Sequence, residues 1–308
     1  MINISGPARS PEIRSGSTAN YLLLILVTVI WGGTFIVTRR ALALTQPFTF
    51  LAIRFSFASI LLAVVFNRRL RAVTPAEIRQ GVFIGIILFA SLAMQALGSR
   101  LTTASEAAFL VGLSVPVVPL IGLPLLRKRP SFQALTGIVI SFAGLTLIST
   151  NGKMELHLGS GEWMMLGAAL TSALHIVVIS KFAPNSDAMN LASIQIITCA
   201  TMSVAMVFVW HEARCVPPVT VVATAVIMGL FATAFALVVM SRVQQTVCAT
   251  KATLIYALEP VWAGGFGLLA GEALRPSAWS GCGLIFTGVI VGSVRFSKSA
   301  TKQKECAR

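Results

Sequence analysis

The sequence predicts an all-α integral membrane protein with ten transmembrane helices, arranged as two inverted five-helix repeats. Three observations predict this fold class. The chain of 308 residues is 56% apolar and only 11% charged, with a mean hydropathy of +0.85, whereas a soluble domain is about 25% charged. The apolar residues gather in ten runs of bilayer-spanning length, about 20 residues each. Prolines and glycines of the first half recur at a fixed spacing in the second half.

The polar segment Met1–Ala19 predicts a disordered cytoplasmic tail, and residues 297–308 predict a second one. The first apolar run lacks a small-residue cleavage site and nine similar runs follow it, so we interpret it as a retained span rather than a signal peptide. Ten crossings leave too few residues for a soluble catalytic domain. The predicted spans are, in order, Asn20–Thr38, Pro47–Phe66, Gly81–Gly98, Thr103–Leu126, Phe132–Thr150, Gly161–Ser180, Ala188–Trp210, Val219–Met240, Ala249–Ala270 and Ala278–Val294.

The basic residues predict the orientation of these spans. Lys and Arg concentrate in the two tails and in alternate loops, such as the loop with Arg68, Arg69 and Arg71. Because basic loops stay in the cytoplasm, both termini are expected there. The formal net charge of +14 therefore reflects topology in a lipid bilayer, and we expect no nucleic-acid partner.

The chain repeats itself, with one copy at residues 20–150 and the other at 161–296. The stretch LAIRF around Arg54 aligns with ASIQI around Gln195. Each copy holds five spans, and because five is odd the second copy must lie upside down relative to the first. Inverted repeats are typical of secondary transporters, whose halves rock about a site near the midplane, although duplication can also build a static bundle. The matching positions, 144 residues apart, are Pro116 and Pro260, Gly137 and Gly281, and Gly144 and Gly288.

Several stretches carry a family resemblance. VTVIWGGTFIVTRRAL, PFTFLAIRF, TTASEAAFLVGLSVPVVPLIG, TKATLIYALEPVWAGGFGLLAGEAL and GCGLIFTGVIVG resemble an EamA-type transporter of the drug/metabolite transporter superfamily. The resemblance implies a central cavity lined by the first, third, fourth, sixth, eighth and ninth spans. It also implies transport of small organic solutes such as amino acids, metabolites or drugs, commonly out of the cell, and a bacterial inner membrane. The family's Gly-Glu pair is present after the ninth span as Gly271-Glu272, but Leu126-Arg127-Lys128 replaces it after the fourth.

Glu259 is the sharpest candidate for a functional residue. It lies ten residues into the ninth span, at about the bilayer midplane. An intramembrane carboxyl is costly, so we expect it to face a cavity, pair with a cation or be protonated. Helical spacing places Tyr256 and Trp262 on its face, a setting that suits an amine or cation. Glu259 could equally bind a coupling proton, or serve only as a protonated packing residue.

Prolines and charges near the same spans form a second set of candidates. Pro116 and Pro260 interrupt the fourth and ninth spans at matching depth, where a kink would help a rocking transporter but is also common in static bundles. Glu106 and Lys251 begin these spans as charges that could gate the pathway. Residues in such places more often extend to the lipid headgroups.

The remaining polar candidates lie inside other spans. His175 in the sixth span suits a proton relay, or else a hydrogen-bonded packing role. Gln95, Trp31 and Thr34 are further lining candidates, although such groups often serve only to join helices. Arg54 lies within the second span, and we interpret it as a structural residue bonded to backbone carbonyls.

The leading functional hypothesis is a secondary transporter driven by a gradient of substrate, proton or counter-solute. The chain contains no GxxxxGK[ST] motif for ATP. It has no HExxH or GxSxG motif, so an intramembrane enzyme is the weaker alternative, and a non-transporting scaffold or receptor remains another. We expect no cofactor. The dispersed cysteines predict neither a metal site nor a disulfide framework: Cys199, Cys215, Cys248, Cys282 and Cys306.

Overall fold

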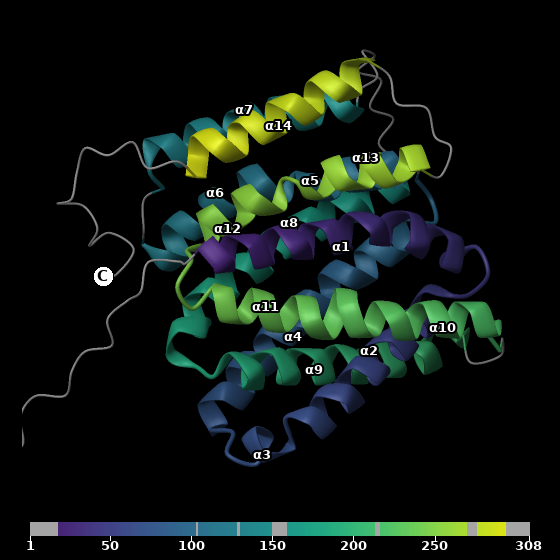
Figure 1. The fold of residues 1–308 in the computed structure, drawn as a ribbon. Coiled ribbons are helices and arrows are strands. Elements are labelled where there is room, and N and C mark those ends of the chain that lie inside the picture. Colours follow the sequence, from purple (N-terminus) through teal and green to yellow (C-terminus); the bar gives the residue numbers. More distant parts are fainter. Residues whose placement is uncertain are drawn as a thin grey trace, which may run out of the picture.

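A computed structural model describes residues 18–102, 104–127, 130–149, 159–212, 216–269 and 276–293, and these residues form an all-helical bundle (Figure 1). Within them, eight helical segments are long and apolar enough to cross a membrane. Two shorter apolar helices, Phe132–Leu147 and Trp279–Gly292, occupy the places of the expected fifth and tenth spans. The all-α membrane fold class is confirmed.

The bundle is built from long helices that run back and forth, several of them divided. The first half comprises α1 (Thr18–Leu42), α2 (Pro47–Val65), α3 (Asn67–Leu70), α4 (Pro75–Gly98), α5 (Ala104–Gly112), α6 (Ser114–Leu126) and α7 (Phe132–Ser149). The second half comprises α8 (Ser160–Phe182), η1 (Ala183–Asn185), α9 (Ala188–Val209), α10 (Val219–Met228), η3 (Gly229–Phe235), α11 (Ala236–Val243), α12 (Ala249–Tyr256), α13 (Glu259–Leu269) and α14 (Pro276–Ser293).

Some boundaries differ from the sequence-based expectation. Residues 1–17 of the expected tail lie outside the described residues, but Thr18 and Ala19 already belong to α1. The third span begins at Pro75 rather than Gly81, because Thr74 and Glu77 form a reciprocal capping box at the start of α4. The capping box therefore starts the helix before the apolar run, although the residues of the first turn are polar.

The fourth and ninth spans are each broken at equivalent positions. Helix α5 ends at Gly112 and α6 begins at Ser114, whereas α12 ends at Tyr256 and α13 begins at Glu259. Pro116 and Pro260 lie four residues after Gly112 and Tyr256. A proline cannot donate to the carbonyl four residues earlier and clashes with it, which explains where the preceding helices end.

The eighth span contains a different irregularity. Its central residues, Gly229–Phe235, form a π-helix between α10 and α11. A π-turn shifts hydrogen bonds from the fourth to the fifth residue along the chain and often marks a functional site. Here it lies against α2, where a Cβ atom at Gly229 would be 2.7 Å from the Arg54 carbonyl oxygen.

A matching contact occurs in the other half of the bundle. A Cβ atom at Gly85 on α4 would lie 2.9 Å from the Gln195 carbonyl oxygen on α9. Gly85 and Gly229 are 144 residues apart, and Arg54 and Gln195 are the residues aligned by the LAIRF and ASIQI stretches. The duplicated sequence positions therefore make equivalent helix contacts.

Helices α7 and α14 form a pair along one side of the bundle (Figure 1). A Cβ atom at Gly137 would lie 2.5 Å from the Gly288 carbonyl oxygen, and one at Gly144 would lie 2.5 Å from that of Gly281. Small residues allow such close approach of membrane helices. This pair is scaffold.

The bundle has two ends that differ in the helix termini they contain. The Thr18 end is where α1, α4, α9 and α12 begin, and it is on the left in Figure 1. The Leu42 end is where α1, α4 and α9 finish. Helix α1 runs from one end of the bundle to the other and packs on α13, α12 and α11.

Candidate functional site

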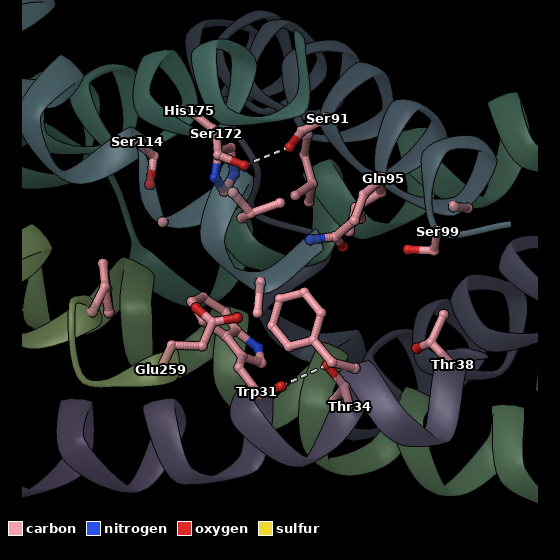
Figure 2. A pocket seen from close by; sticks show the side chains of 18 of the residues that line it. Trp31, Thr34, Thr38, Ser91, Gln95, Ser99, Ser114, Ser172, His175 and Glu259 are labelled. Carbon is pink, nitrogen blue, oxygen red and sulfur yellow. Dashed lines mark hydrogen bonds between the residues drawn. The ribbon is translucent and has the colours of Figure 1, made fainter. Parts of the chain in front are cut away.

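A cavity of about 130 Å³ lies among the helices at the centre of the bundle (Figure 2). The first, third, fourth, sixth, eighth and ninth spans line it, and the second span contributes as well. Its wall includes Trp31, Thr34, Phe35 and Thr38 from α1; Phe50, Leu51 and Arg54 from α2; Leu88, Ser91, Leu92 and Gln95 from α4; Val111 and Gly112 from α5; Ser114 and Val115 from α6; Ser172 and His175 from α8; Leu237 and Met240 from α11; and Tyr256, Glu259 and Pro260 from the ninth span.

Glu259 enters the cavity from the break between α12 and α13 (Figure 2). Its side chain is partly buried and makes no hydrogen bond or ion pair with any residue that the structure describes. Its carbonyl oxygen would lie 2.9 Å from a Cβ atom at Gly32, so α1 holds this segment closely. The arrangement leaves the carboxyl group available to a solute or a proton.

Two aromatic residues form the wall beside Glu259. The rings of Trp31 and Tyr256 are 5.6 Å apart between centroids. The Trp31 indole Nε1 donates a 3.0 Å hydrogen bond to the carbonyl oxygen of Ala232 in the π-helix. The Tyr256 hydroxyl accepts a 3.5 Å hydrogen bond from Gln244, the residue that caps the end of α11. Both side chains are therefore fixed from neighbouring helices.

His175 belongs to a buried polar chain that leads away from the cavity. Its Nε2 atom is 2.9 Å from Oε1 of Gln195 on α9. The amide of Gln195 in turn donates a 3.2 Å hydrogen bond to Ser241 on α11. Gln195 and Ser241 are fully buried. This chain joins three helices around one wall of the cavity.

Arg54 also lies in the cavity wall, although it is only 8% exposed. Its Nε donates a 2.7 Å hydrogen bond to the Thr233 hydroxyl, and its Nη2 donates a 3.4 Å hydrogen bond to the Ala232 carbonyl. The carbonyl partner agrees with the expectation from sequence. The cavity position was not expected, because the resemblance implied no lining role for the second span.

The cavity differs between its two ends. Toward the Leu42 end it reaches Thr38 and Ser99 (Figure 2). The residues that follow these two in the chain, Arg39 and Arg100, are exposed. Toward the Thr18 end, Ser180 donates a 2.9 Å hydrogen bond to Gln244, which is 2% exposed. Nearby residues along the chain on either side of Ser180 and Gln244 are also buried: Ile179, Ala183, Ser241, Val243 and Val247. The cavity therefore approaches solvent at the Leu42 end and is closed toward the Thr18 end.

The structure does not bring every sequence candidate to this cavity. The Trp262 indole points to α1, where its Nε1 donates a 3.0 Å hydrogen bond to Thr28. Its ring also makes an edge contact with Phe286 on α14, and Trp262 is not a lining residue although it lies on α13 with Glu259. Pro116 and Lys251 are not among the lining residues. The side chain of Glu106 lies outside the described residues, as do Lys128, Gly271 and Glu272.

Other lining residues were missed by the sequence analysis. The hydroxyls of Ser91 on α4 and Ser172 on α8 are 2.6 Å apart, and the Ser91 hydroxyl donates to the Ala168 carbonyl. Figure 2 shows this pair opposite Trp31 and Thr34. Serines are common at helix contacts in membranes, so nothing in the sequence marked these two. Among the described residues, no group of three or more His, Cys, Asp and Glu side chains could hold a metal ion.

Comparison with known proteins shows to which family the chain belongs. The profile described as the EamA-like transporter family matches residues 18–150 and 159–294. The chain belongs to this family. One relative, an uncharacterized transporter of Archaeoglobus fulgidus, is 28% identical over 88% of this chain and 85% of its own length. The uncharacterized transporter YyaM of Bacillus subtilis is 20% identical over 92% and 97%.

A solved structure is similar to this EamA-family chain in fold. A crystal structure of another protein superposes with a TM-score of 0.75 and covers 90% of this chain and 96% of that one. At 17% identity, this likeness shows the fold alone. The EamA-family chain is thus a multi-pass membrane transporter, and its central cavity is the candidate site for a small-molecule substrate.

Proposed function

We propose that this protein is a secondary transporter that moves a small organic solute out of the cell by alternating access. The observation that carries the proposal is the central cavity, closed toward the Thr18 end, with the carboxyl group of Glu259 unpartnered among the described residues of its wall. A static bundle gains nothing from such a group, because an intramembrane carboxyl is costly without a partner. A non-transporting scaffold would be expected to fill this space.

Glu259 is the proposed binding and coupling residue. Its carboxylate, next to the rings of Trp31 and Tyr256, suits a cationic group. A proton neutralises the same carboxylate, so solute and proton compete for one site. Arg54, His175 and Tyr256 are the other titratable groups of the described wall. The competition would couple solute movement to a proton gradient.

The proposed orientation follows from the basic residues. Lys and Arg gather in loops at the Thr18 end, such as Arg68, Arg69 and Arg71, and basic loops remain in the cytoplasm. Both termini would then be cytoplasmic in an inner membrane, and the cavity in this structure would face outward. A reporter that is active only in the cytoplasm, fused to the C-terminus, tests this orientation. Activity only of a periplasmic reporter would contradict it.

The decisive experiment is solute flux in liposomes with and without a pH gradient. The panel contains neutral, cationic, anionic and zwitterionic solutes, and wild type is compared with Glu259→Gln. We expect the variant to lose proton-driven flux by at least about tenfold, because it keeps the shape of Glu259 but cannot exchange a proton. The control is Glu162→Gln, in the first turn of α8 and outside the cavity wall. Equal proton-driven flux of wild type and Glu259→Gln would sink the coupling role of Glu259.

A further inference from the structure

A second hollow lies between α1, the span formed by α10 and the π-helix, and the end of α13. Figure 1 shows α1 between α13 and that span, and α1 packs on both. The volume of this hollow, called the lateral groove below, is about 850 Å³. It falls within the roughly 300–1,000 Å³ of pockets that bind small molecules. Its lining includes Ile30, Gly33, Arg40, Ile227, Phe231 and Phe266.

The lateral groove opens on the outside of the bundle. Ile227, Phe231 and Leu269 line it and are 59%, 51% and 85% exposed. All three belong to helical segments that are long and apolar enough to cross a membrane. Large apolar side chains on the outer surface of such helices contact lipid rather than water. The molecule that fills the groove therefore comes from the bilayer.

The length of the groove matches one leaflet of a membrane. Ile30 is at the middle of α1, and Arg40 lies two residues before its end. Ten helical residues cover about 15 Å, which is about half of a bilayer core of about 30 Å. On the neighbouring span the groove runs from Thr224, near the start of α10, to Ala232 in the π-helix. The groove thus reaches from the membrane centre to the Leu42 end, as one acyl chain does.

Arg40 places a positive charge where the headgroup of that lipid would lie. It is exposed and is the charged residue among the lining residues that the structure describes. No ion pair joins it to another residue of the described part of the chain, where the recorded pair is Arg69 and Asp187. The planar fork of a guanidinium matches a phosphate, and basic pockets between transmembrane helices bind anionic headgroups.

Gly33 keeps the inner part of the groove open. A Cβ atom at Gly33 would lie 3.4 Å from the ring of Phe266, which also lines the groove. A longer side chain would extend into the space beside this ring. The neighbouring Gly32 has a different role, since a Cβ atom there would lie 2.6 Å from the Cβ atom of Trp262. Gly32 allows helix packing, whereas Gly33 leaves room for a ligand.

We propose that the lateral groove binds an anionic phospholipid, with its phosphate on Arg40 and one acyl chain against Ile30, Phe231 and Phe266. A net negative headgroup is favoured because the cationic group of a zwitterionic headgroup would be repelled by Arg40. The bound chain would lie behind one wall of the central cavity, since Thr34 lines both spaces. This inference is independent of the proposed transport function.

Two lipids with the same acyl chains test the proposal. Purified full-length protein in a neutral detergent is mixed with palmitoyl-oleoyl phosphatidylglycerol or with palmitoyl-oleoyl phosphatidylcholine. Native mass spectrometry counts the lipids retained on each protein, and the rise in melting temperature with lipid concentration measures binding. We expect one retained phosphatidylglycerol, bound at least about fivefold more tightly than phosphatidylcholine, because only its headgroup is anionic. Glycerol phosphate, which has no acyl chain, should bind far more weakly than the lipid.

Two pairs of variants locate the site. Arg40→Gln should bind both lipids equally, whereas its control Arg39→Gln should keep the preference, because Arg39 is exposed but does not line the groove. Gly33→Leu fills the groove and should weaken retention of phosphatidylglycerol at least about fivefold. Its control is Gly265→Leu on α13, where a Cβ atom meets nothing within 4 Å. If Gly33→Leu does not fold, the two arginine variants decide, since both arginines are exposed.

Several outcomes would overturn the inference. Equal binding of the two lipids by the wild type does so, as does an unchanged preference in Arg40→Gln. Glycerol phosphate that binds as tightly as the lipid would show an anion site without the groove. A dimer that retains no lipid and that Gly33→Leu dissociates would assign the groove to a second copy of the chain. Because none of these measurements involves flux, the proposed transport function stands or falls separately.

Discussion

The carbonyl oxygen of Ala232 accepts hydrogen bonds from two cavity residues at once. Trp31 donates from α1 at 3.0 Å and Arg54 donates from α2 at 3.4 Å. A carbonyl oxygen has two lone pairs and can accept from both donors, and this one belongs to the π-helix, where the regular bonding of the backbone is shifted. One irregular turn therefore fixes the side chains of two other helices.

Thr233 is the residue through which this arrangement can be tested. The change Thr233→Val removes the hydroxyl that accepts from Arg54 Nε and leaves a buried guanidinium nitrogen without that partner. We expect a loss of about 1–3 kcal/mol in stability, measured as a lower melting temperature in detergent. Transport of the substrate should weaken in parallel.

Two further variants provide the comparison for Thr233→Val. Thr233→Ser keeps the hydroxyl and should restore most of the stability. Thr224→Val changes a half-buried threonine on α10 whose hydroxyl donates to the Thr220 carbonyl of the same helix, so its effect should stay within about 0.5 kcal/mol. An equal loss for Thr224→Val would show that the Arg54 contact has no special weight.

At the scale of elements, the duplicated sequence produces duplicated contacts. Gly85 and Gly229 each lie against the carbonyl of the residue aligned between the repeats, Gln195 or Arg54. The breaks before Pro116 and Pro260 are likewise equivalent. The chemistry has diverged, since Arg54 contacts the π-helix whereas Gln195 contacts His175. The scaffold repeats, but the site does not.

A methyl group at Gly229 should separate α2 from the π-helix. In Gly229→Ala the new Cβ would lie 2.7 Å from a backbone oxygen, which cannot move away as a flexible side chain could. We expect a loss of about 1–3 kcal/mol from overpacking, and the same for Gly85→Ala. Thermal unfolding measures both.

The matched control for both glycine variants is Gly265→Ala on α13. A Cβ atom there meets nothing within 4 Å, so the higher helix propensity of alanine should make this change neutral or slightly stabilising. If Gly229→Ala melts at the same temperature as Gly265→Ala, α2 and the π-helix pack less closely than described.

At the scale of the whole molecule, the bundle is asymmetric between its ends. The cavity reaches Thr38 and Ser99 at the Leu42 end, whereas Gln244 and its buried neighbours close the Thr18 end. Alternating access requires a second state in which this asymmetry is reversed. The hydrogen bonds of Gln244 to Ser180 and Tyr256 would then have to break.

Cysteine labelling distinguishes the two ends. In a cysteine-free background, Ser99→Cys should react with a membrane-impermeant maleimide added from the side that the Leu42 end faces. Gln244→Cys should react at least about tenfold more slowly from either side, because the side chain is 2% exposed. A transported solute should change the Ser99→Cys rate. Fast reaction of Gln244→Cys alone would mean that the open state faces the Thr18 end.

The sequence predicted the site unevenly, for reasons that particular residues make clear. Glu259, Tyr256, His175, Gln95 and Trp31 were chosen as polar or aromatic groups at depth, and all line the cavity. Trp262 was chosen by its helical spacing from Glu259, and both residues do lie on α13, but the Trp262 side chain contacts Thr28 and Phe286 instead of the cavity. Arg54 was placed on a helix outside the cavity because the family resemblance implied no lining role for the second span, and the sequence alone does not show which helices meet.

The sequence by itself determined the membrane environment, the helical class, the internal repeat and the two prolines that interrupt matching spans. These features depend on composition and on backbone chemistry local to each span. Only the tertiary structure decided that the π-helix joins Arg54 to Trp31, that Ser91 meets Ser172 and that the cavity approaches one end of the bundle. Such features arise from the packing of helices far apart in sequence, where the approach of a few side chains selects one arrangement among many that the same hydrophobic pattern permits.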